Sequence, residues 1–287
     1  MFKLSRPLHL LFLALAYALG VAITDYLGIP FSASAFALGL VCIGLAHVGM
    51  NLLAEVFRPA NEPILPGQFG AERVYLRDRL LIIAIGLLAI AAGFAYLLYL
   101  SDQLEFDALI LLALSLFIVF AYAVPPLRLA RRGFGELLLA AHIGYVAPSL
   151  GFVLQAGDFH RLLPIFALPV TTLALAYFLV LDFPSFADDI KYERLTLLTR
   201  LGWQRVVPLH HGLVLLAYAF LAAAPLLGVS LALIWPAFLA LPFAVMQIIM
   251  LRNIALGARP LWRPLASLAA AFFALTVYLL AFAFFLR

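Results

Sequence analysis

The chain has 287 residues, of which 67% are hydrophobic and only 11% are charged. A soluble domain carries about a quarter of its residues as Asp, Glu, Lys and Arg, so a soluble globular protein is excluded. Intrinsic disorder is excluded as well, because a chain this apolar cannot stay solvated. The composition therefore indicates a membrane protein, and the formal net charge of +4 has to be interpreted from the positions of its basic residues.

Apolar runs long enough to cross a membrane follow one another along the whole chain. A spanning helix needs roughly 20 mostly apolar residues. Charge clusters and Pro/Gly breaks separate nine such runs, at 8–27, 32–56, 80–100, 107–124, 136–156, 162–182, 206–227, 230–251 and 264–286. The runs are continuously apolar and do not alternate as barrel strands do. We predict an all-α polytopic membrane protein, a single domain over 1–287 with nine transmembrane helices around a central cavity.

The basic residues are divided unequally between the two sides of such a bundle. With nine spans, 16 of the 18 Lys and Arg residues fall on the side of the N-terminus, and only Arg161 and Arg287 fall on the other. The positive-inside rule then makes the N-terminus cytoplasmic. We predict a multi-pass protein of the cell (inner) membrane. Because the basic charge is explained by topology, nucleic acid is rejected as a partner.

The second predicted span carries polar side chains on one face. His47, Asn51 and Glu55 are spaced i, i+4 and i+8, so they line one side of a helix and descend toward its cytoplasmic end. Ionisable groups at membrane depth are costly and are functional candidates by default. His47 also has a structural interpretation, as a packed residue that is hydrogen-bonded across the bundle.

The sixth predicted span ends in a similar polar face. Asp182, Ser185 and Asp189 are spaced i, i+3 and i+7 and share one face if Pro184 only kinks the turn. The second and sixth spans run in the same direction through the membrane. The acidic ends of the two spans are therefore expected at the same side, where they can act together.

An arginine-rich turn follows the fourth span on that same side. Its basic residues are Arg128, Arg131 and Arg132, which either anchor the topology or bind a ligand. Carboxylate oxygens hold Mg²⁺, and arginine forks pair with phosphate oxygens. An apolar bundle beneath them suits a hydrocarbon tail. A polyprenyl diphosphate matches all three features, and membrane lipid surrounds the bundle.

Two stretches carry a resemblance to a known family. The segment Tyr122 to Gly133, YAVPPLRLARRG, closely resembles a YSxPPLRLKRRG signature, and the segment Asp189 to Gly202, DIKYERLTLLTRLG, resembles a DxxxGKRTLxxRLG motif. Both belong to the UbiA superfamily of intramembrane prenyltransferases, in the branch of menaquinone-type, chlorophyll-type and archaeal lipid enzymes. The resemblance covers nearly the whole chain. It implies Mg²⁺-assisted transfer of a prenyl group from a polyprenyl diphosphate to a lipophilic or aromatic acceptor.

The first aspartate motif of that family is altered here. It reads NDxxDxxxD, and Asn51 matches its first position. Leu52 and Pro59 replace its first and last aspartates, and Glu55 substitutes for the middle one. Only one carboxylate of the motif is therefore left in register.

The second aspartate motif and the basic tract are altered as well. Ser185 stands where an aspartate is usual, Asp189 matches, and Asp182 falls where Asn or Asp occurs. Ala130 replaces a lysine of the basic tract. The residues left in register imply a site that holds one Mg²⁺ ion, binds it weakly, or relies on basic residues instead.

The resemblance assigns roles to three groups of residues. The catalytic and metal-binding residues are Asn51, Glu55, Asp182 and Asp189. The diphosphate-binding residues are Arg128, Arg131, Arg132 and Lys191. The substrate pocket contains His47, Tyr122 and Tyr145, of which Tyr145 also has a structural interpretation.

Two other functions compete with prenyl transfer. The missing aspartates leave open a catalytically altered relative that binds or cyclises a prenyl lipid without transferring it. A transporter is the more remote alternative, because transporters place their polar sites near the midplane of the membrane. Here the polar groups cluster at one membrane face.

Overall fold

The computed structural model describes residues 4–65 and 70–287, and within them the fold is helical throughout. The elements, in chain order, are α1 (Pro7–Tyr26), α2 (Ala33–Val56), α3 (Gly70–Leu100), α4 (Phe106–Ala123), η1 (Leu129–Arg131), α5 (Gly135–Ala141), η2 (His142–Val146), α6 (Ala147–Ala156), α7 (Leu162–Asp182), η3 (Phe183–Ser185), α8 (Phe186–Lys191), α9 (Leu197–Leu201), α10 (Trp203–Ala223), η4 (Ala224–Leu227), α11 (Leu231–Ile234), η5 (Trp235–Ala240), α12 (Leu241–Ala255) and α13 (Trp262–Phe285). The predicted all-α class is confirmed.

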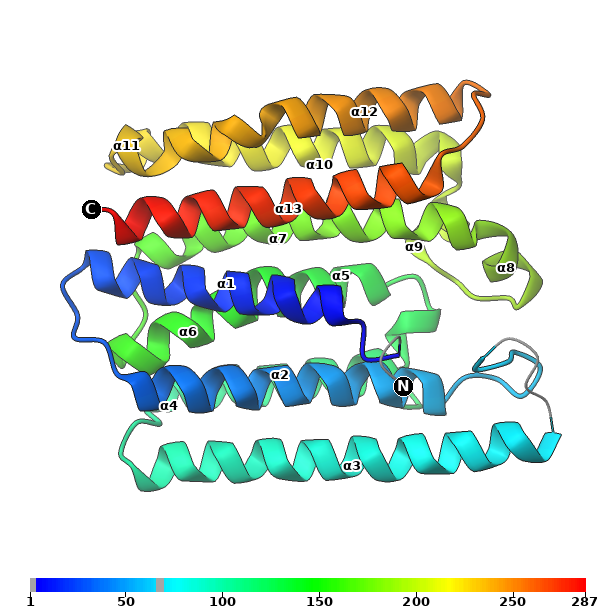
Figure 1. The fold of residues 1–287 in the computed structure, drawn as a ribbon, viewed down its shortest axis with the longest axis horizontal. Coiled ribbons are helices and arrows are strands. Elements are labelled where there is room, and N and C mark those ends of the chain that lie inside the picture. The colour runs from blue at the N-terminus through cyan, green and yellow to red at the C-terminus, as the bar shows by residue number, and fades with distance from the viewer. Residues whose placement is uncertain (1–3, 66–69) are drawn as a thin grey trace.

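Nine helical segments of the described chain are long and apolar enough to cross a membrane, which confirms the predicted number. Four of these segments combine several elements: 135–156, 162–191, 203–227 and 231–255. Figure 1 shows the long helices side by side along one direction, with the start of α1 and the end of α13 at opposite ends of the bundle. An odd number of crossings requires this arrangement of the termini.

Two predicted boundaries differ clearly from the structure. The third span begins at Gly70 and not at 80, because the charges at 72–79 end the apolar run but not the helix. The sixth span continues to Lys191 and does not stop at 182. There the chain passes Pro184 in the single 3₁₀ turn η3 and resumes as α8, since a proline within the first turn needs no backbone donor.

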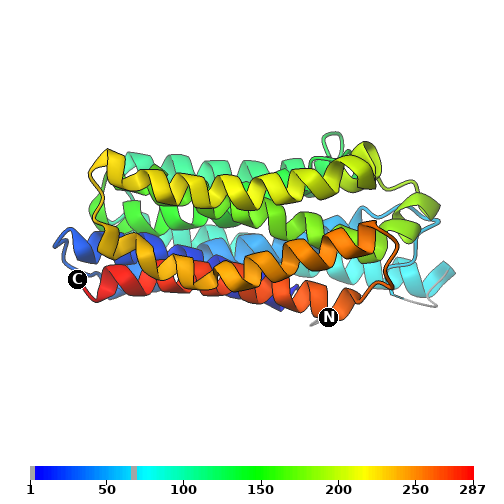
Figure 2. The same cartoon turned by 90° about the horizontal axis from the view of Figure 1, so that it is seen from above.

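The spans differ in how much protein surrounds them. In the segment 135–156, 78% of the most apolar window is buried inside the protein, whereas in α3 the buried share is 17%. The segment 135–156 is therefore central, and it packs against α1 and α7. Helix α3 packs mainly on α2 and lies at the edge of the bundle (Figure 1), so it is largely hidden behind the other helices in Figure 2. Its exposed apolar side chains suit contact with lipid.

Glycines allow α1 to approach α6 at backbone distance. A Cβ added at Gly20 of α1 would collide with the Pro148 carbonyl oxygen and lie 2.8 Å from the Phe152 nitrogen, both on α6. A Cβ added at Gly151 of α6 would in turn collide with the Tyr17 carbonyl oxygen. Small residues at such crossings let membrane helices pack closely, because lipid offers no hydrophobic drive to associate.

We expect Gly20→Ala to destabilise the bundle by about 1–3 kcal/mol, because the atoms that the new methyl group meets belong to a rigid backbone. The thermal unfolding midpoint in detergent measures the effect. Gly86→Ala on α3 is the control, since a Cβ there meets nothing within 4 Å. Equal midpoints for the two variants would contradict the close crossing.

Candidate active site at the polar end of the bundle

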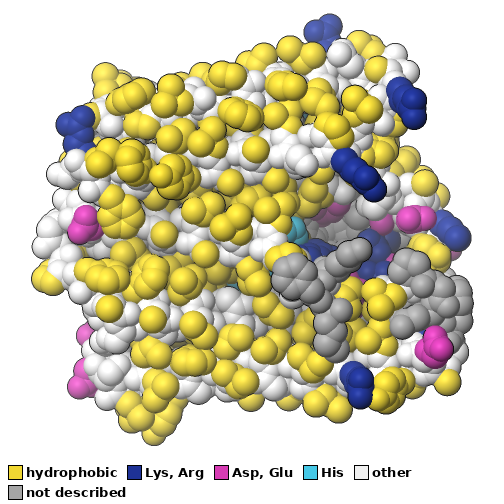
Figure 3. Space-filling model, viewed as in Figure 1, with side chains coloured by type: hydrophobic (Ala, Val, Ile, Leu, Met, Phe, Trp, Pro, Cys, Tyr) yellow, Lys and Arg dark blue, Asp and Glu magenta, His cyan; other side chains and the backbone are white. Residues whose placement is uncertain are grey.

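Charged side chains gather in a hollow at one end of the bundle, which we call the polar end (Figure 3). The polar end is formed by the last turns of α2, the loop 57–65, the connection 124–134 and the segment 183–202. Most of the remaining surface in this view is apolar (Figure 3). The hollow therefore joins parts of the chain that lie more than 100 residues apart in sequence.

One carboxylate holds three arginines at the centre of the polar end. Glu62 is 2% exposed and pairs with Arg58 at 3.3 Å, and it also pairs directly with Arg131 and Arg194. Burial alone would raise the pKa of Glu62, but Arg194, Arg131 and Arg58 outweigh burial and hold that pKa below its ordinary value. Glu62 thus joins the loop 57–65 to both of the other charged segments.

The loop that carries Glu62 is fixed by a buried arginine of α3. The Arg73 guanidinium donates hydrogen bonds to the carbonyl oxygens of Arg58 and Pro59, each at 2.7 Å, and to that of Glu62 at 3.2 Å. Three carbonyl acceptors on one guanidinium satisfy backbone groups that a loop leaves free. These hydrogen bonds therefore fix the position of the loop in the site.

Asp189 is buried beside the same cluster. Its carboxylate accepts a hydrogen bond from the Ser185 hydroxyl at 3.0 Å and lies 3.3 Å from Arg194. Burial opposes the positive charge of Arg194, but Glu62 and Asp189 more than offset burial and raise the pKa of Arg194. The predicted shared face of Ser185 and Asp189 is therefore present, across the turn at Pro184.

The polar residues of α2 lie at the edge of this cluster. Glu55 is buried and pairs with Arg58. Asn51 is 1% exposed, and its amide donates to the Ser5 carbonyl oxygen at 3.4 Å, while its Oδ1 has no hydrogen-bond partner. The segment before α1 therefore also contributes to the site, which the spacing of the motif residues does not predict.

A polar cavity of about 100 Å³ lies next to the ion-pair cluster. Its polar lining consists of Arg6, His9, Tyr122, Glu136, Asp182, Arg194 and Thr196. The carboxyl groups of Asp182 and Glu136 contact each other in it, and the buried atoms Asp182 Oδ2 and Glu136 Oε2 have no other hydrogen-bond partner. Glu136 Oε1 accepts from the Leu197 backbone N–H at 3.0 Å, which positions that side chain. Two carboxyl groups with unpaired oxygens therefore face a small cavity.

Arg128 is the predicted arginine with a free donor. It is half-buried, and its Nη2 has no hydrogen-bond partner. Burial and the nearby charge of Arg131 lower the pKa of Arg128. Its backbone adopts φ 44°, in the left-handed region that residues other than glycine rarely occupy. Such conformations are costly and cluster at functional sites.

Other predicted residues lie apart from the cluster. Arg132 is exposed and contributes its carbonyl oxygen, which accepts from Arg200 at 3.0 Å. Lys191 is exposed, and its amine lies 5.0 Å from the centre of the Tyr192 ring. The structure therefore does not bring Arg132 and Lys191 together with Arg128 and Arg131, and their assigned role in diphosphate binding stays a prediction.

The three residues predicted for the substrate pocket occupy different places. Tyr122 lines the polar cavity and accepts a hydrogen bond from Arg6 at 3.5 Å. His47 lies deeper, fully buried, with its Nδ1 3.1 Å from Nδ1 of His142. Tyr145 lies in η2, is half-buried and does not line the polar cavity. The predicted pocket is thus divided between the polar end and the interior.

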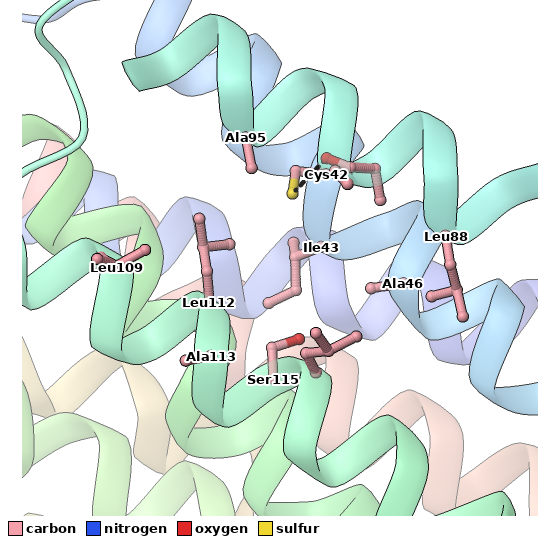
Figure 4. Close-up of a pocket in the computed structure, with 12 residues that line it drawn as sticks. Cys42, Ile43, Ala46, Leu88, Ala95, Leu109, Leu112, Ala113 and Ser115 are labelled. Carbon is pink, nitrogen blue, oxygen red and sulfur yellow. Dashed lines mark hydrogen bonds between the residues drawn. The ribbon is translucent and has the colours of Figure 1, made fainter.

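An apolar cavity of about 290 Å³ lies between α2, α3 and α4 (Figure 4), and the residues of α2 that line it, 42–46, belong to the middle of that helix. Its lining includes Cys42, Ile43 and Ala46 of α2 and Ser115 of α4. A second apolar hollow, of about 420 Å³, shares Leu88 with it and ends near Phe57 and Val124, next to the polar end. The second hollow therefore offers the expected room for a hydrocarbon beside the polar end.

A metal ion would find few protein ligands here. In the described chain, no three His, Cys, Asp or Glu side chains are grouped closely enough to hold a metal ion. However, Asn51 Oδ1, Asp182 Oδ2 and Glu136 Oε2 are buried oxygens that accept no hydrogen bond from an N–H or hydroxyl group, and they are the hard donors that Mg²⁺ prefers. Mg²⁺ commonly uses one or two carboxylates and takes its other ligands from water and phosphate. The donor set fits that pattern.

Several residues of the site were not predicted from the sequence. Arg194 stands at the lysine of the DxxxGKRTLxxRLG motif, so the motif contained a signal for it. Glu193 stands at the glycine of that motif and has φ 51°, which explains why glycine suits the position. Glu62 and Glu136 offered no such signal, because they lie outside both motifs, and Glu62, although seven residues after Glu55, lies beyond the end of α2.

Comparisons with known proteins agree with this architecture. A sequence model of the UbiA prenyltransferase family matches residues 71–260. A UbiA homolog from Archaeoglobus fulgidus bound to GPP and Mg²⁺ has the same fold, at 15% identity and a TM-score of 0.65, over 97% of this chain and 98% of that one. A digeranylgeranylglyceryl phosphate synthase aligns at 15% identity with a TM-score of 0.59, over 98% of both chains.

A UbiA homolog from Aeropyrum pernix K1 aligns at 15% identity with a TM-score of 0.53, over 96% of both chains. At such identities the likeness shows the fold alone. No curated protein matches the chain.

We expect the stability of the protein to depend on the ionisation of Glu62. Its folded pKa lies below the unfolded value of about 4.3, so its contribution is present above that pH and is lost as pH falls through the folded pKa. Thermal unfolding of wild type and Glu62→Gln, followed from pH 7 to below pH 4, should show midpoints that differ at neutral pH and converge in acid. The exposed Glu72→Gln is the control. A difference that is constant with pH would refute the assignment.

Proposed function

We propose that this chain, which belongs to the UbiA prenyltransferase family, transfers a prenyl group inside the membrane. The donor is a polyprenyl diphosphate and the acceptor is a lipophilic or aromatic molecule. The single observation that carries this proposal is that the arginine–carboxylate cluster lies next to an apolar hollow between α2, α3 and α4, which Phe57 and Val124 line at its polar end. A charged head and a hydrocarbon tail are accommodated together only at such a boundary.

The diphosphate group is proposed to bind among Arg128, Arg131 and Arg194. Arg128 has a free buried donor, and arginine forks bind phosphate oxygens in pairs. Arg131 and Arg194 are engaged by Glu62, so a bound diphosphate has to share or replace that carboxylate. Arg6, which lines the polar cavity together with Arg194, is a further cation within the site.

Mg²⁺ is the proposed cofactor, and Asn51, Glu55, Asp182 and Asp189 are the proposed residues at the metal–diphosphate complex. When bound, Mg²⁺ supplies positive charge to the leaving diphosphate. The Archaeoglobus fulgidus homolog was solved with GPP and Mg²⁺, and with DMAPP and Mg²⁺, which supports the class of ligand. Glu136, whose carboxyl group contacts that of Asp182, joins this set as a residue that the motifs do not contain.

The reaction proposed here breaks the bond between the allylic C1 and the diphosphate oxygen, and both electrons leave with the diphosphate. A bond then forms between C1 and the acceptor, which loses one proton. The arginines stabilise the charge that grows on the leaving group, and the water-poor interior protects the allylic cation. The ring of Tyr122 lines the cavity between these two regions, where an aromatic face stabilises a cation.

A second function has one specific observation in its favour. The two motif carboxylates that remain in register are each paired with an arginine: Glu55 with Arg58, and Asp189 with Arg194. A site neutralised in this way suits a relative that binds or cyclises a prenyl lipid without transferring it. Release of inorganic diphosphate without a prenylated acceptor would support cyclisation, and binding without any release would support a lipid-binding protein.

We expect Asp189→Asn to lower prenyl transfer by about 10²–10³-fold, because the variant loses a buried carboxylate that is proposed to hold Mg²⁺ at the diphosphate. Transfer of a radiolabelled prenyl group in proteoliposomes, with Mg²⁺ and with a chelator in its place, measures the effect. Asp188→Asn is the matched control, because Asp188 is the exposed neighbour on α8. Undiminished transfer by Asp189→Asn would remove Asp189 from the site.

The proposed orientation places the polar end in the cytoplasm of a cell with this protein in its inner membrane. Cysteines introduced at Asn61 and Asp158, exposed near opposite ends of the bundle, test it. The native Cys42 is buried and gives little background. In intact cells an impermeant maleimide should label Asp158→Cys, and it should label Asn61→Cys only after permeabilisation. The reverse pattern would invert the orientation.

A further inference from the structure

Three buried polar side chains form a row inside the apolar part of the bundle. The Ser115 hydroxyl of α4 lies 2.8 Å from Nε2 of His142, and Nδ1 of His142 lies 3.1 Å from Nδ1 of His47 on α2. The exposed fractions are 2% for Ser115 and 0% for both histidines. The two rings are stacked, with centroids 5.3 Å apart. Three helical elements thus contribute to one hydrogen-bonded row.

The row has hydrogen-bonding capacity left at both ends. A hydrogen bond between two imidazole nitrogens requires one of them to be a bare acceptor, so the row is ordered in one direction or the other. Nε2 of His47 is buried and has no partner. A serine hydroxyl offers one donor and two acceptor positions, and His142 uses only one of the three. Ser115 can therefore bind a second group.

An irregular turn of the backbone positions His142 in this row. Residues His142–Val146 form η2, a π-helical turn inside the span 135–156. Such turns are rare and are frequent at functional sites, because the extra residue redirects the side chains that follow. Gly144 within the turn lies against the Thr171 backbone of α7, where a Cβ would collide. The turn is accordingly held in place by its packing.

Ser115 faces the apolar cavity between α2, α3 and α4 (Figure 4). The rest of the cavity lining is Cys42 and aliphatic side chains, and the Cys42 thiol already donates to the Ala91 carbonyl oxygen at 3.3 Å. The Ser115 hydroxyl is thus the polar group with capacity left in a cavity of about 290 Å³. No charged side chain is among the residues that line this cavity.

The other end of the row approaches the polar cavity. The His47 ring lies edge-on to His9, with centroids 6.0 Å apart, and His9 lines the polar cavity with Asp182. The row of polar side chains therefore extends from the apolar cavity toward the place proposed for the diphosphate. A molecule anchored at Ser115 would lie in the same bundle interior as the reacting end of the prenyl chain.

We propose that Ser115, held by His142 and His47, is the hydrogen-bonding anchor for an uncharged, hydroxyl-bearing apolar molecule in this cavity, and that this molecule is the prenyl acceptor. The assignment of the molecule as acceptor rests on the proposed function. An uncharged ligand follows from the lining, because a carboxylate in this cavity would be buried without a cation. The ligand is expected to carry a hydroxyl group, because Ser115 can both donate and accept a hydrogen bond.

Three probes of similar ring size test the ligand class: 1-naphthol, naphthalene and 1-naphthoate. Binding to the purified full-length protein is measured in the same detergent by ligand-observed NMR. We expect wild type to bind 1-naphthol about three- to tenfold more tightly than naphthalene, the range that one hydrogen bond provides. Binding of 1-naphthoate is expected to be weaker than that of naphthalene.

Ser115→Ala should abolish the preference for 1-naphthol and leave naphthalene binding unchanged. His142→Phe should weaken the preference, because it removes the group that orients Ser115. Ser149→Ala is the matched control, since Ser149 of α6 is equally buried and its Oγ has no hydrogen-bond partner. The control should keep the full preference, and thermal unfolding verifies that all variants are folded.

Several results would overturn the proposal. These are equal affinities of wild type for 1-naphthol and naphthalene, a preference that survives in Ser115→Ala, tighter binding of 1-naphthoate, or no binding of any probe. The binding assay contains no prenyl diphosphate, so it is independent of catalysis. If the probes behave as expected while prenyl transfer fails, the anchor stands and the proposed function does not. If transfer succeeds and the preference is absent, the anchor alone is refuted.

Discussion

The polar end depends on one interaction, the contact of the Glu62 carboxylate with three arginines. Arg58, Arg131 and Arg194 come from three separate segments, and like charges gathered so closely would repel without an anion between them. Glu62 supplies that anion and is itself fixed through the backbone bonds of Arg73. The loop 57–65, the turn after α4 and the segment after α8 are thereby joined into one surface.

The same interaction has a functional side. A carboxylate that binds three guanidinium groups occupies the kind of position that a phosphate prefers. The arginines are therefore already arranged for an anion before a substrate arrives, which lowers the cost of ordering their long side chains. The loss of motif aspartates at Leu52, Pro59 and Ser185 is accompanied by a site in which arginine contributes much of the charge balance.

Hydropathy and the distribution of charge predicted the number of spans and the common side of the two acidic faces, since both follow from segment length and helical period. Two helical stretches were missed: the helix that continues past Pro184 and the charged start of α3. An apolar run marks the part of a helix that lies in the membrane, and the helix can extend beyond that part. Glu62 and Glu136 were missed for a different reason. Their importance arises from loop geometry and from contacts across more than 60 residues, which no local spacing encodes.

Cys42 is the chain's single cysteine, and its thiol lies at the wall of the apolar cavity, hydrogen-bonded to a backbone carbonyl of α3. The protein consequently has a built-in chemical reporter at the wall of this cavity. A small membrane-permeant thiol reagent should modify it at a rate set by whether the cavity is filled. Occupancy can then be followed in native membranes without introducing any foreign residue.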